Sequence, residues 1–383
     1  MTDPEIVMPL PGMYFPMPWR VHAEADLLEK RGLAFMERHG LCRGADRRER
    51  VVETRSALFF AGFCPDADVD RLQTAVDWAY TMFVFDDLAC DEEAPEDSFS
   101  FLDLAVRVAR TLESPTAGLL PPGHLFTGAV TDLAERLHRL ASPTQRRRLL
   151  DAHRGWYLGV AWERAARLRR SAPALNDYFA ARLLYAAGFP TLAWAQMSQV
   201  DDIPDTDVDS PAVHALTEMA ITVAAVDDDL YSHGKELWWA ARGPDATGPV
   251  LNPVDLYQRH GRCGRDEALR QVVALRDRIV ARFTEVRDAV LPGAGEPLHR
   301  YLSDLTCLIR GNYEWGIRAG RYTNPDGRHP GAVTTTGTVT DAPSATGAPA
   351  GIPCLAWWWH PLTGPAHRPP TQAGRRPTAG PRP

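Results

Sequence analysis

The stretch that decides the fold is residues 219–236, which read MAITVAAVDDDLYSHGKE. Its first half is almost wholly apolar, and its second half places Asp228, Ser232 and Glu236 at positions i, i+4 and i+8. On an α-helix these side chains share one stripe, because each step of four residues turns only about 40° and rises about 6 Å. The stretch therefore predicts a buried helix with a carboxylate, a hydroxyl and a second carboxylate along one side.

These oxygen donors suit a hard divalent cation such as Mg²⁺, which keeps several waters and shares its remaining sites with substrate phosphates. The alternative is a solvated acidic face on a surface helix. The apolar run before Asp227 disfavours that alternative, because charges on a buried helix require partners or a metal. Lys235 is one of only two lysines in the chain, and it supplies a point charge suited to a phosphate.

A second acidic cluster ends another apolar helical pattern. Asp86, Asp87 and Asp91 come directly after residues 82–85, which read MFVF. Trp78 lies two turns before Asp86 on the same stripe, so apolar side chains are expected to form a cavity wall beside the carboxylates.

The composition excludes several classes of protein. The chain has 383 residues, of which 45% are hydrophobic and 24% charged, as is usual for a soluble globular protein. A net charge of −7 argues against a nucleic-acid surface. The six cysteines are dispersed and read as free thiols of a reducing cytoplasm. No apolar run supports a signal peptide or stable membrane insertion, so a cytoplasmic protein is expected.

Helical periodicity covers residues 21–325, which are expected to form one all-helical domain without competing strand-like alternation. Asp66 is the expected N-cap of the helix that ends in the second acidic cluster. The expected helices span about residues 22–40, 46–62, 66–92, 97–113, 124–140, 144–170, 176–188, 191–200, 211–242, 264–290 and 295–322.

The two ends of the chain differ from this domain. Residues 1–20 contain five prolines among apolar residues, which favours an extended arm able to pack across a cavity mouth. Residues 326–383 are rich in Pro, Gly and Thr and lack periodicity, so a disordered tail is expected. Within it, Trp357–Trp359 is either an interaction site or part of an extension from a shifted reading frame.

Two acidic helix ends in an all-helical chain resemble the bacterial class I terpene synthases. Residues 86–91, DDLACD, are similar to the longer form of the family's aspartate-rich motif. Residues 228–236, DDLYSHGKE, are similar to its second metal motif, with Asp228 where the family usually has asparagine. The resemblance covers roughly residues 10–325. It implies an all-α, single-domain class I terpenoid synthase-like bundle around a central apolar cavity.

Two further motifs carry the resemblance. Arg182 stands 46 residues before Asp228 (228 − 182), near the spacing of the family's diphosphate-sensing arginine. Residues 312–315, NYEW, followed by Arg321 and Tyr322, resemble the C-terminal motif that closes over the diphosphate. The residues implied for catalysis and diphosphate binding are Arg182, Lys235, Arg321 and Tyr322, with Asn312 as a further substrate contact. The family's effector carbonyl lies just past Arg182, and the choice among residues 185–188 stays open.

The resemblance also implies a metal cofactor and a substrate. The cofactor is Mg²⁺, as three ions with Mn²⁺ as a substitute. Its implied ligands are Asp86, Asp87, Asp91, Asp228, Ser232 and Glu236. The substrate is a linear prenyl diphosphate, with farnesyl diphosphate favoured over geranylgeranyl diphosphate. It is cyclised to a terpene hydrocarbon or alcohol with release of diphosphate.

An apolar cavity with aromatic faces protects a carbocation from water. The aromatic residues expected to line it are Trp78, Phe83, Phe85, Phe189, Trp194, Trp238 and Trp315, with plain core packing as the alternative for each. Nucleic acid is not an expected partner, and a homodimer is an open alternative to a single chain.

Residues 201–205, DDIPD, fit the short aspartate-rich pattern, but Pro204 and the polar run after it predict an exposed loop. Two aspartate-rich motifs would indicate a chain-elongating prenyl transferase of the same fold. A non-catalytic helical binding protein with a vestigial metal site is the alternative from another class. The motif at Asp228 favours the cyclase.

Overall fold

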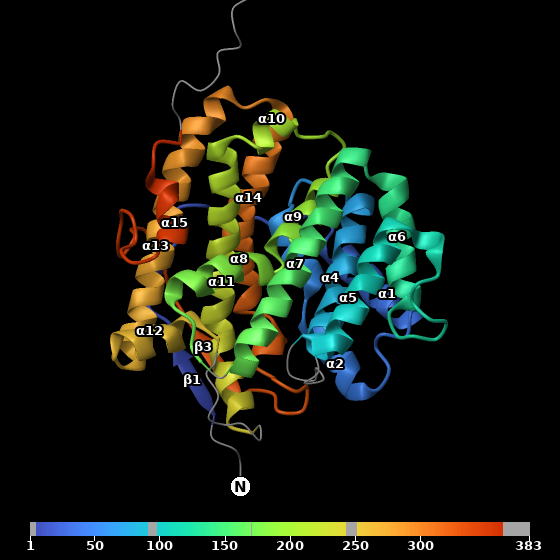
Figure 1. Ribbon diagram of the computed structural model, residues 1–383, viewed down its shortest axis with the longest axis horizontal. Helices are drawn as coiled ribbons and strands as arrows, with labels where there is room; N and C mark the ends of the chain where they lie inside the picture. Colours follow the sequence, from blue (N-terminus) through green and yellow to red (C-terminus); the bar gives the residue numbers. More distant parts are fainter. Residues whose placement is uncertain (1–4, 91–97, 170, 243–250, 363–383) are drawn as a thin grey trace, which may run out of the picture.

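The computed structural model describes residues 5–90, 98–169, 171–242 and 251–362, and α-helices dominate this part of the chain (Figure 1). The α-helices are α1 (Ala25–Arg38), α2 (Ala45–Glu53), α3 (Ser56–Phe63), α4 (Val69–Ala89), α5 (Ser98–Glu113), α6 (Thr127–Leu140), α7 (Pro143–Arg169), α8 (Leu175–Tyr185), α9 (Gly188–Met197), α10 (Asp205–Val208), α11 (Pro211–Ala240), α12 (Pro253–Gly261), α13 (Arg265–Val290), α14 (Glu296–Gly316) and α15 (Pro353–Ala356). The 3₁₀ turns are η1 (Pro115–Ala117), η2 (Leu291–Gly293), η3 (Gly320–Tyr322) and η4 (Trp357–Trp359), and the strands are β1 (Ile6–Pro9), β2 (Met13–Tyr14), β3 (Val333–Thr336) and β4 (Val339–Thr340).

Helix α11 lies at the centre of the bundle and packs against α8, α13 and α14 (Figure 1). It begins where the Ser210 side chain accepts a hydrogen bond from the backbone N–H of Val213, and Pro211 occupies its first turn. Its apolar first half is buried, as the sequence indicates. The predicted all-α fold is thus confirmed. Within the described ranges, no helix has both the length and the apolar character needed to cross a membrane.

Most helices begin and end within a few residues of the predicted bounds, but two details differ in the N-terminal part. The helix predicted over 46–62 is two helices, α2 and α3, separated where Arg55 adopts φ 47°. Asp68, not Asp66, caps α4 by accepting from the Arg71 N–H at 2.9 Å. Asp66 instead forms an ion pair with Arg20.

The C-terminal part of the bundle also differs from the prediction. The last long helix, α14, ends at Gly316, and a separate 3₁₀ turn, η3, carries Arg321 and Tyr322. Helix α12 was not expected. The short helix is capped by Asn252, whose Oδ1 accepts from the Val254 N–H at 2.9 Å.

The two ends of the chain pair with each other. β1 runs parallel to β3 with Ile6 opposite Val333, and β2 runs parallel to β4 with Met13 opposite Val339. In Figure 1, β1 and β3 lie beside the C-terminal half of α11. Strand pairing of this kind joins segments more than 300 residues apart, so no local periodicity announces it.

The described part of the tail therefore departs from the expected disorder. Residues 326–362 pack on the bundle, and the Trp358 side chain is fully buried. Its indole Nε1 donates to Glu218 Oε2 at 3.0 Å. The rest of the tail, residues 363–383, lies outside the described ranges.

Candidate active site

The stripe on α11 forms as predicted. Ser232 Oγ donates to Glu236 Oε1 at 2.7 Å, so residues one turn apart touch. Asn252 Nδ2 donates to Glu236 Oε2 at 3.0 Å. Burial raises the pKa of Glu236 to about 8, against the opposing effect of these hydrogen bonds. A cation beside Glu236 would favour the charged form of this carboxyl group.

Asp228, the first residue of the stripe, meets the predicted sensor arginine and the predicted tyrosine. Arg182 Nη2 lies 2.8 Å from Asp228 Oδ2, and Tyr322 donates its hydroxyl hydrogen to Asp228 Oδ1 at 2.7 Å. Residues from α8, α11 and η3 therefore converge at one carboxylate. Helix α8 brings Arg182 there because it packs directly on α11.

Sequence reasoning missed a buried group directly beside this contact. The same Arg182 Nη2 lies 2.8 Å from Asp229 Oδ1, and Tyr178 donates to Asp229 Oδ2 at 2.7 Å. Asn252 Nδ2 also donates to the Asp229 carbonyl at 2.7 Å. The third aspartate of the run was a visible signal for this network. Tyr178 lies one turn before Arg182, which is the spacing that places both on one helix face.

The second acidic helix end faces cations from two other elements. Arg50 Nη2 lies 3.0 Å from Asp87 Oδ2, and Arg321 Nη2 lies 3.6 Å from Asp87 Oδ1. The Arg321 guanidinium also lies over the Phe83 ring, 4.4 Å from its centroid. Asp86 is half-buried, and Asp91 lies outside the described residues.

A small polar cavity lies between Asp87 of α4 and Lys235 of α11. Its lining residues are Arg50, Asp87, Lys235, Arg321, Asn324 and Pro325. Lys235 comes from the second motif and Arg321 from the C-terminal motif, so the structure brings both to Asp87. Arg50 was not predicted, because it belongs to an arginine-rich stretch, residues 43–50, and no spacing distinguishes it.

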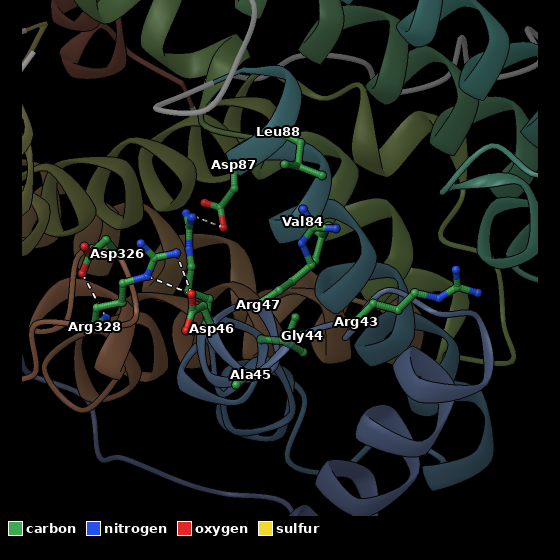
Figure 2. Close-up of a pocket in the computed structure, with 12 residues that line it drawn as sticks. Arg43, Gly44, Ala45, Asp46, Arg47, Val84, Asp87, Leu88, Asp326 and Arg328 are labelled. Carbon is green, nitrogen blue, oxygen red and sulfur yellow. Dashed lines mark hydrogen bonds and ion pairs between the residues drawn. The ribbon is translucent and has the colours of Figure 1, made fainter.

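A larger cavity of about 570 Å³ adjoins this one and shares Arg50 and Asp87 with it. Figure 2 shows Asp87 on one side of it and Asp46 and Arg328 on the other. Arg328 Nη2 lies 2.6 Å from Asp46 Oδ2, so one of the arginines that line this cavity is already in an ion pair.

The residues present fit a hard divalent cation. Asp87 Oδ1 is buried and accepts no hydrogen bond within the described ranges, and Glu236 presents a second, half-buried carboxyl group. Both are hard oxygen donors. Across residues 5–90, 98–169, 171–242 and 251–362, however, no three His, Cys, Asp or Glu side chains gather closely enough to form a metal site by themselves.

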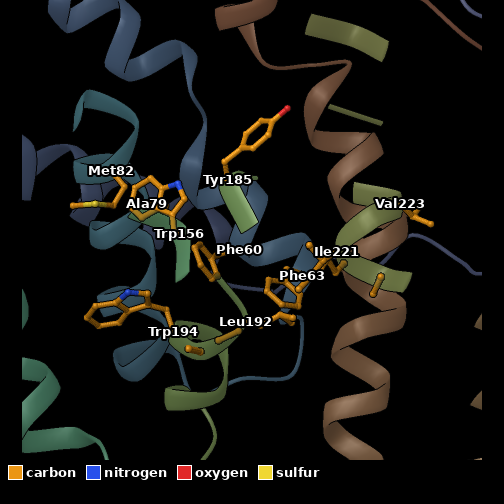
Figure 3. Packing of buried hydrophobic residues seen from close by; sticks show 14 of the residues in the cluster. Phe60, Phe63, Ala79, Met82, Trp156, Tyr185, Leu192, Trp194, Ile221 and Val223 are labelled. Carbon is orange, nitrogen blue, oxygen red and sulfur yellow. The ribbon is translucent and has the colours of Figure 1, made fainter. Parts of the chain in front are cut away.

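The predicted aromatic residues separate into groups. Trp78 stacks on Trp194 with their ring centroids 5.9 Å apart, and Phe83 stacks on Trp315 at 5.8 Å. Phe189 is half-buried at the start of α9. Figure 3 shows Trp194 among the apolar side chains between α4, α9 and α11, a group that includes Phe60, Phe63, Leu192 and Ile221.

Phe85, Trp238 and Asn312 make contacts that the sequence did not indicate. Phe85 packs against Phe101 of α5, Phe126 just before α6, and Trp156 of α7. Trp238 contacts Trp239 and His329 near the C-terminal end of α11. The Asn312 amide donates to the Ala224 carbonyl and to the Tyr231 hydroxyl, so it ties α14 to α11. Because α4, α11 and α14 are buried on several sides, aromatic or polar residue type alone does not identify the face toward a cavity.

The helical structure is interrupted between α8 and α9, just past Arg182. Ala187 adopts φ 58°, and α9 begins at Gly188. A Cβ atom on Gly188 would lie 2.4 Å from Ile221 Cγ2, so glycine allows α9 to approach α11 closely.

Residues 201–204 of the acidic pattern form a loop, as predicted, and Asp205 begins α10. Asp201 pairs with Arg300 at 2.8 Å and is 61% exposed, and Asp202 accepts from Ser142 Oγ at 2.8 Å. Both residues lie between α9 and α10, away from the two acidic helix ends.

The chain is similar in sequence and in structure to known proteins. Residues 77–282 match the family described as terpene synthase family 2, C-terminal metal binding. Phomopsene synthase of Allokutzneria albata is 50% identical over 94% of this chain and 98% of its own length. Diterpene cyclase DtcycA of a Streptomyces species is 31% identical over 94% of this chain and 100% of its own. The crystal structure of the SVS_A2 protein from ancestral sequence reconstruction is 39% identical, with a TM-score of 0.78 over 91% of this chain and 98% of that protein.

Proposed function

Because this chain belongs to the bacterial class I terpene synthases, a metal-binding family of terpene cyclases, we propose that it ionises a linear prenyl diphosphate with the help of Mg²⁺. The allylic carbon–oxygen bond breaks, the diphosphate leaves with the electron pair, and the carbocation cyclises. Loss of a proton then gives a hydrocarbon, and capture of water gives an alcohol.

One observation supports this proposal most strongly. The cavity between α4 and α11 is lined by Asp87 of the first acidic motif, Lys235 of the second and Arg321 of the C-terminal motif. These residues are more than 80 positions apart in sequence, and each comes from a different motif of the resemblance. A site that sets the Asp87 carboxylate beside the cations Lys235 and Arg321 is suited to a metal-bound diphosphate.

When bound, Mg²⁺ neutralises the carboxylates and stabilises the negative charge of the leaving diphosphate. Asp86, Asp87 and Asp91 would hold it from α4 and the residues that follow, and Asp228, Ser232 and Glu236 from α11. Arg182 and Arg321 are suited to bind diphosphate oxygens through paired N–H groups, and Lys235 acts as a point charge. Tyr322 supplies one hydroxyl donor. Together such groups contribute several kcal/mol to ionisation.

Arg182 is held in position before substrate binds. Its contacts with Asp228 and Asp229 fix the guanidinium beside the metal stripe, and its Nε is buried without a hydrogen-bond partner among the described residues. We assign that donor to a diphosphate oxygen. The buried pair Trp78–Trp194 and the pair Phe83–Trp315, in which Phe83 is partly buried, are proposed to exclude water and to favour positive charge at their ring faces.

The proposed substrate is the C20 diphosphate in preference to the C15 diphosphate, which reverses the order expected from the sequence. The support is that a relative aligned over its full length is named a diterpene cyclase.

The test incubates the full chain with the C10, C15 and C20 allylic diphosphates, with Mg²⁺ or with a chelator, followed by gas chromatography with mass detection. We expect cyclic products with Mg²⁺ only, and more from C20 than from C15. Consumption of the homoallylic diphosphate with chain elongation would instead indicate a prenyl transferase. Absence of any Mg²⁺-dependent product would indicate a binding protein.

A further inference from the structure

Helix α11 has a second stripe that the proposed mechanism does not use. Asp227, Tyr231 and Gly234 follow at i, i+4 and i+7. With 3.6 residues per turn, their mean direction is roughly 130° away from that of Asp228, Ser232 and Glu236. Residues of this second stripe contact the N-terminal arm and the start of the C-terminal tail, on a different side of α11 from the metal stripe.

Strands β1 and β3 press on the glycine inside the metal motif. A Cβ atom on Gly234 would lie 2.5 Å from Val333 Cγ1 and 3.1 Å from Met8 Cγ. Glycine inside a helix costs about 1 kcal/mol relative to alanine, so a packing reason is required for it here. Thr335 Oγ1 also donates to the Tyr231 carbonyl at 3.4 Å. The paired strands thus contact α11 between Ser232 and Glu236.

A buried ion network contacts the same stripe at Asp227, about one turn before Tyr231 and about two turns before Gly234. Arg276 Nε lies 2.8 Å from Asp227 Oδ1, and Arg276 Nη1 lies 3.1 Å from Asp277 Oδ1. All three side chains are 0% exposed. Removing such charges from water costs several kcal/mol per ion, so the network adds little net stability. Its effect is to fix the position of α11 relative to α13.

Both ends of the chain bind to this network. Arg276 donates to the Tyr14 carbonyl, and its guanidinium lies 3.8 Å from the centroid of the Phe15 ring. Asp277 accepts from the Tyr14 N–H at 3.1 Å, and it accepts from the Ser344 N–H and Oγ at 2.9 and 2.7 Å. The network therefore links the N-terminal arm and the tail to the residue directly before Asp228.

We propose that the paired terminal strands and the Asp227–Arg276–Asp277 network position the metal stripe of α11. In this account Gly234, Arg276 and Asp277 are positioning residues, which act on metal binding through the rotation and placement of the helix. The proposal rests on the proposed function, because it requires Ser232 and Glu236 to bind metal. It assigns to the tail a role in the catalytic site of its own chain.

The test adds a methyl group on the Gly234 side of the Gly234–Val333 contact and then removes the methyl groups on the Val333 side. Gly234→Ala forces Val333 away, and Val333→Ala in the same chain restores the space. The readout is the Kd of Mn²⁺ in the presence of inorganic diphosphate, measured by electron paramagnetic resonance on the full chain. We expect Gly234→Ala to raise this Kd by about tenfold or more, and the double variant to return it to near the wild-type value. Gly128→Ala on α6, whose Cβ would lie 2.7 Å from His39 Nδ1, is the matched control and should leave the Kd unchanged.

A second variant tests the ion network. Arg276→Lys keeps the charge but loses the paired contacts, and it should also raise the Mn²⁺ Kd. Should this variant fail to fold, the Gly234 and Val333 series still decides the matter. A wild-type Kd in folded Gly234→Ala, or a raised Kd that Val333→Ala does not lower, overturns the proposal.

Glu236→Ala separates this inference from the proposed function. If wild type binds no Mn²⁺ with diphosphate, or Glu236→Ala binds as well as wild type, the proposed metal site itself is wrong. If Glu236→Ala abolishes binding while Gly234→Ala does not alter it, only the positioning role is wrong.

Discussion

Arg182 and Asp228 form an ion pair, with 2.8 Å between Nη2 and Oδ2, although 46 residues separate them. The same arginine nitrogen lies equally close to Asp229 Oδ1. The two aspartates differ in burial, because the Asp228 side chain is 35% exposed and that of Asp229 is 4% exposed. One carboxylate is thus accessible to a metal, and the other is a buried anchor.

This difference predicts opposite outcomes for one conservative change. Asp228→Asn keeps an oxygen ligand, so we expect a folded protein with diphosphate release within about tenfold of wild type. Asp229→Asn removes the charge that Arg182 and Tyr178 both contact. Breaking a buried pair costs about 3–5 kcal/mol, so urea unfolding should show a clear loss of stability. Equal stability of the two variants would contradict the assignment of Asp229 as the anchor.

Arg321 is predicted to affect both rate and product. Arg321→Ala loses the contacts with Asp87 and the Phe83 ring, so turnover should fall, and residual product should contain more acyclic or water-quenched alcohol. Tyr322→Phe should do less, because only one hydrogen bond is lost. Gas chromatography of the products decides this. Arg318→Ala is the control, since Arg318 pairs with Glu314 on the same segment. An unchanged product ratio in Arg321→Ala would exclude a role in closing the cavity.

The tail is predicted to stabilise the fold. An aperiodic segment suggests that deleting residues 330–383 is harmless, but the structure reverses that expectation because Val333, Leu355 and Trp358 are buried. Trp358→Ala should lower the free energy of unfolding by about 3–5 kcal/mol. Its half-buried neighbour offers a control, Trp359→Ala, which should cost clearly less. Chemical denaturation of both variants gives the answer, and equal small losses would show that the tail is not docked.

A buried histidine predicts a pH dependence of stability. Trp78 Nε1 donates to His153 Nε2 at 3.0 Å, and burial lowers the pKa of His153 to about 4. The unfolded chain protonates this histidine near its ordinary pKa of 6.5, whereas the folded protein resists protonation until about pH 4. Its contribution to stability is therefore complete above pH 6.5 and falls by about 3 kcal/mol as the pH drops to 4.

The measurement compares wild type with His153→Gln, which keeps an acceptor but does not titrate. The difference in unfolding free energy between them should shift by about 3 kcal/mol in favour of the variant between pH 7 and pH 4. His299→Gln, at an exposed histidine, is the control. A constant difference between wild type and His153→Gln over this range would mean that the histidine is not held neutral by burial.

Side-chain patterns that repeat along one helix could be predicted from the sequence, whereas contacts between distant segments could not. The stripe at Asp228, Ser232 and Glu236 was readable because its spacing is a property of one helix. The Asp87 contact with Arg50 was not readable, because α2 and α4 meet only through tertiary packing. Pairing of β1 with β3 was missed for the same reason.

Residue type also proved weaker evidence than residue position. The cavity-lining role of Phe85 and Trp238 stays a prediction, because the structure shows only their packing against other aromatic groups. The substrate contact of Asn312 also stays a prediction, and its amide donates to α11. Helices buried on several sides place apolar and polar residues on faces that a linear pattern does not distinguish.

The central claim is that the acidic stripe of α11 binds the metal that drives ionisation. The most direct measurement is the rate of diphosphate release from the C20 allylic diphosphate as Mg²⁺ is titrated, with wild type and Glu236→Ala compared at equal folded concentration. We predict release that saturates with Mg²⁺ in wild type, stops when a chelator is added, and is lost in Glu236→Ala. Wild-type release from folded Glu236→Ala, or release that persists without divalent metal, would contradict the account.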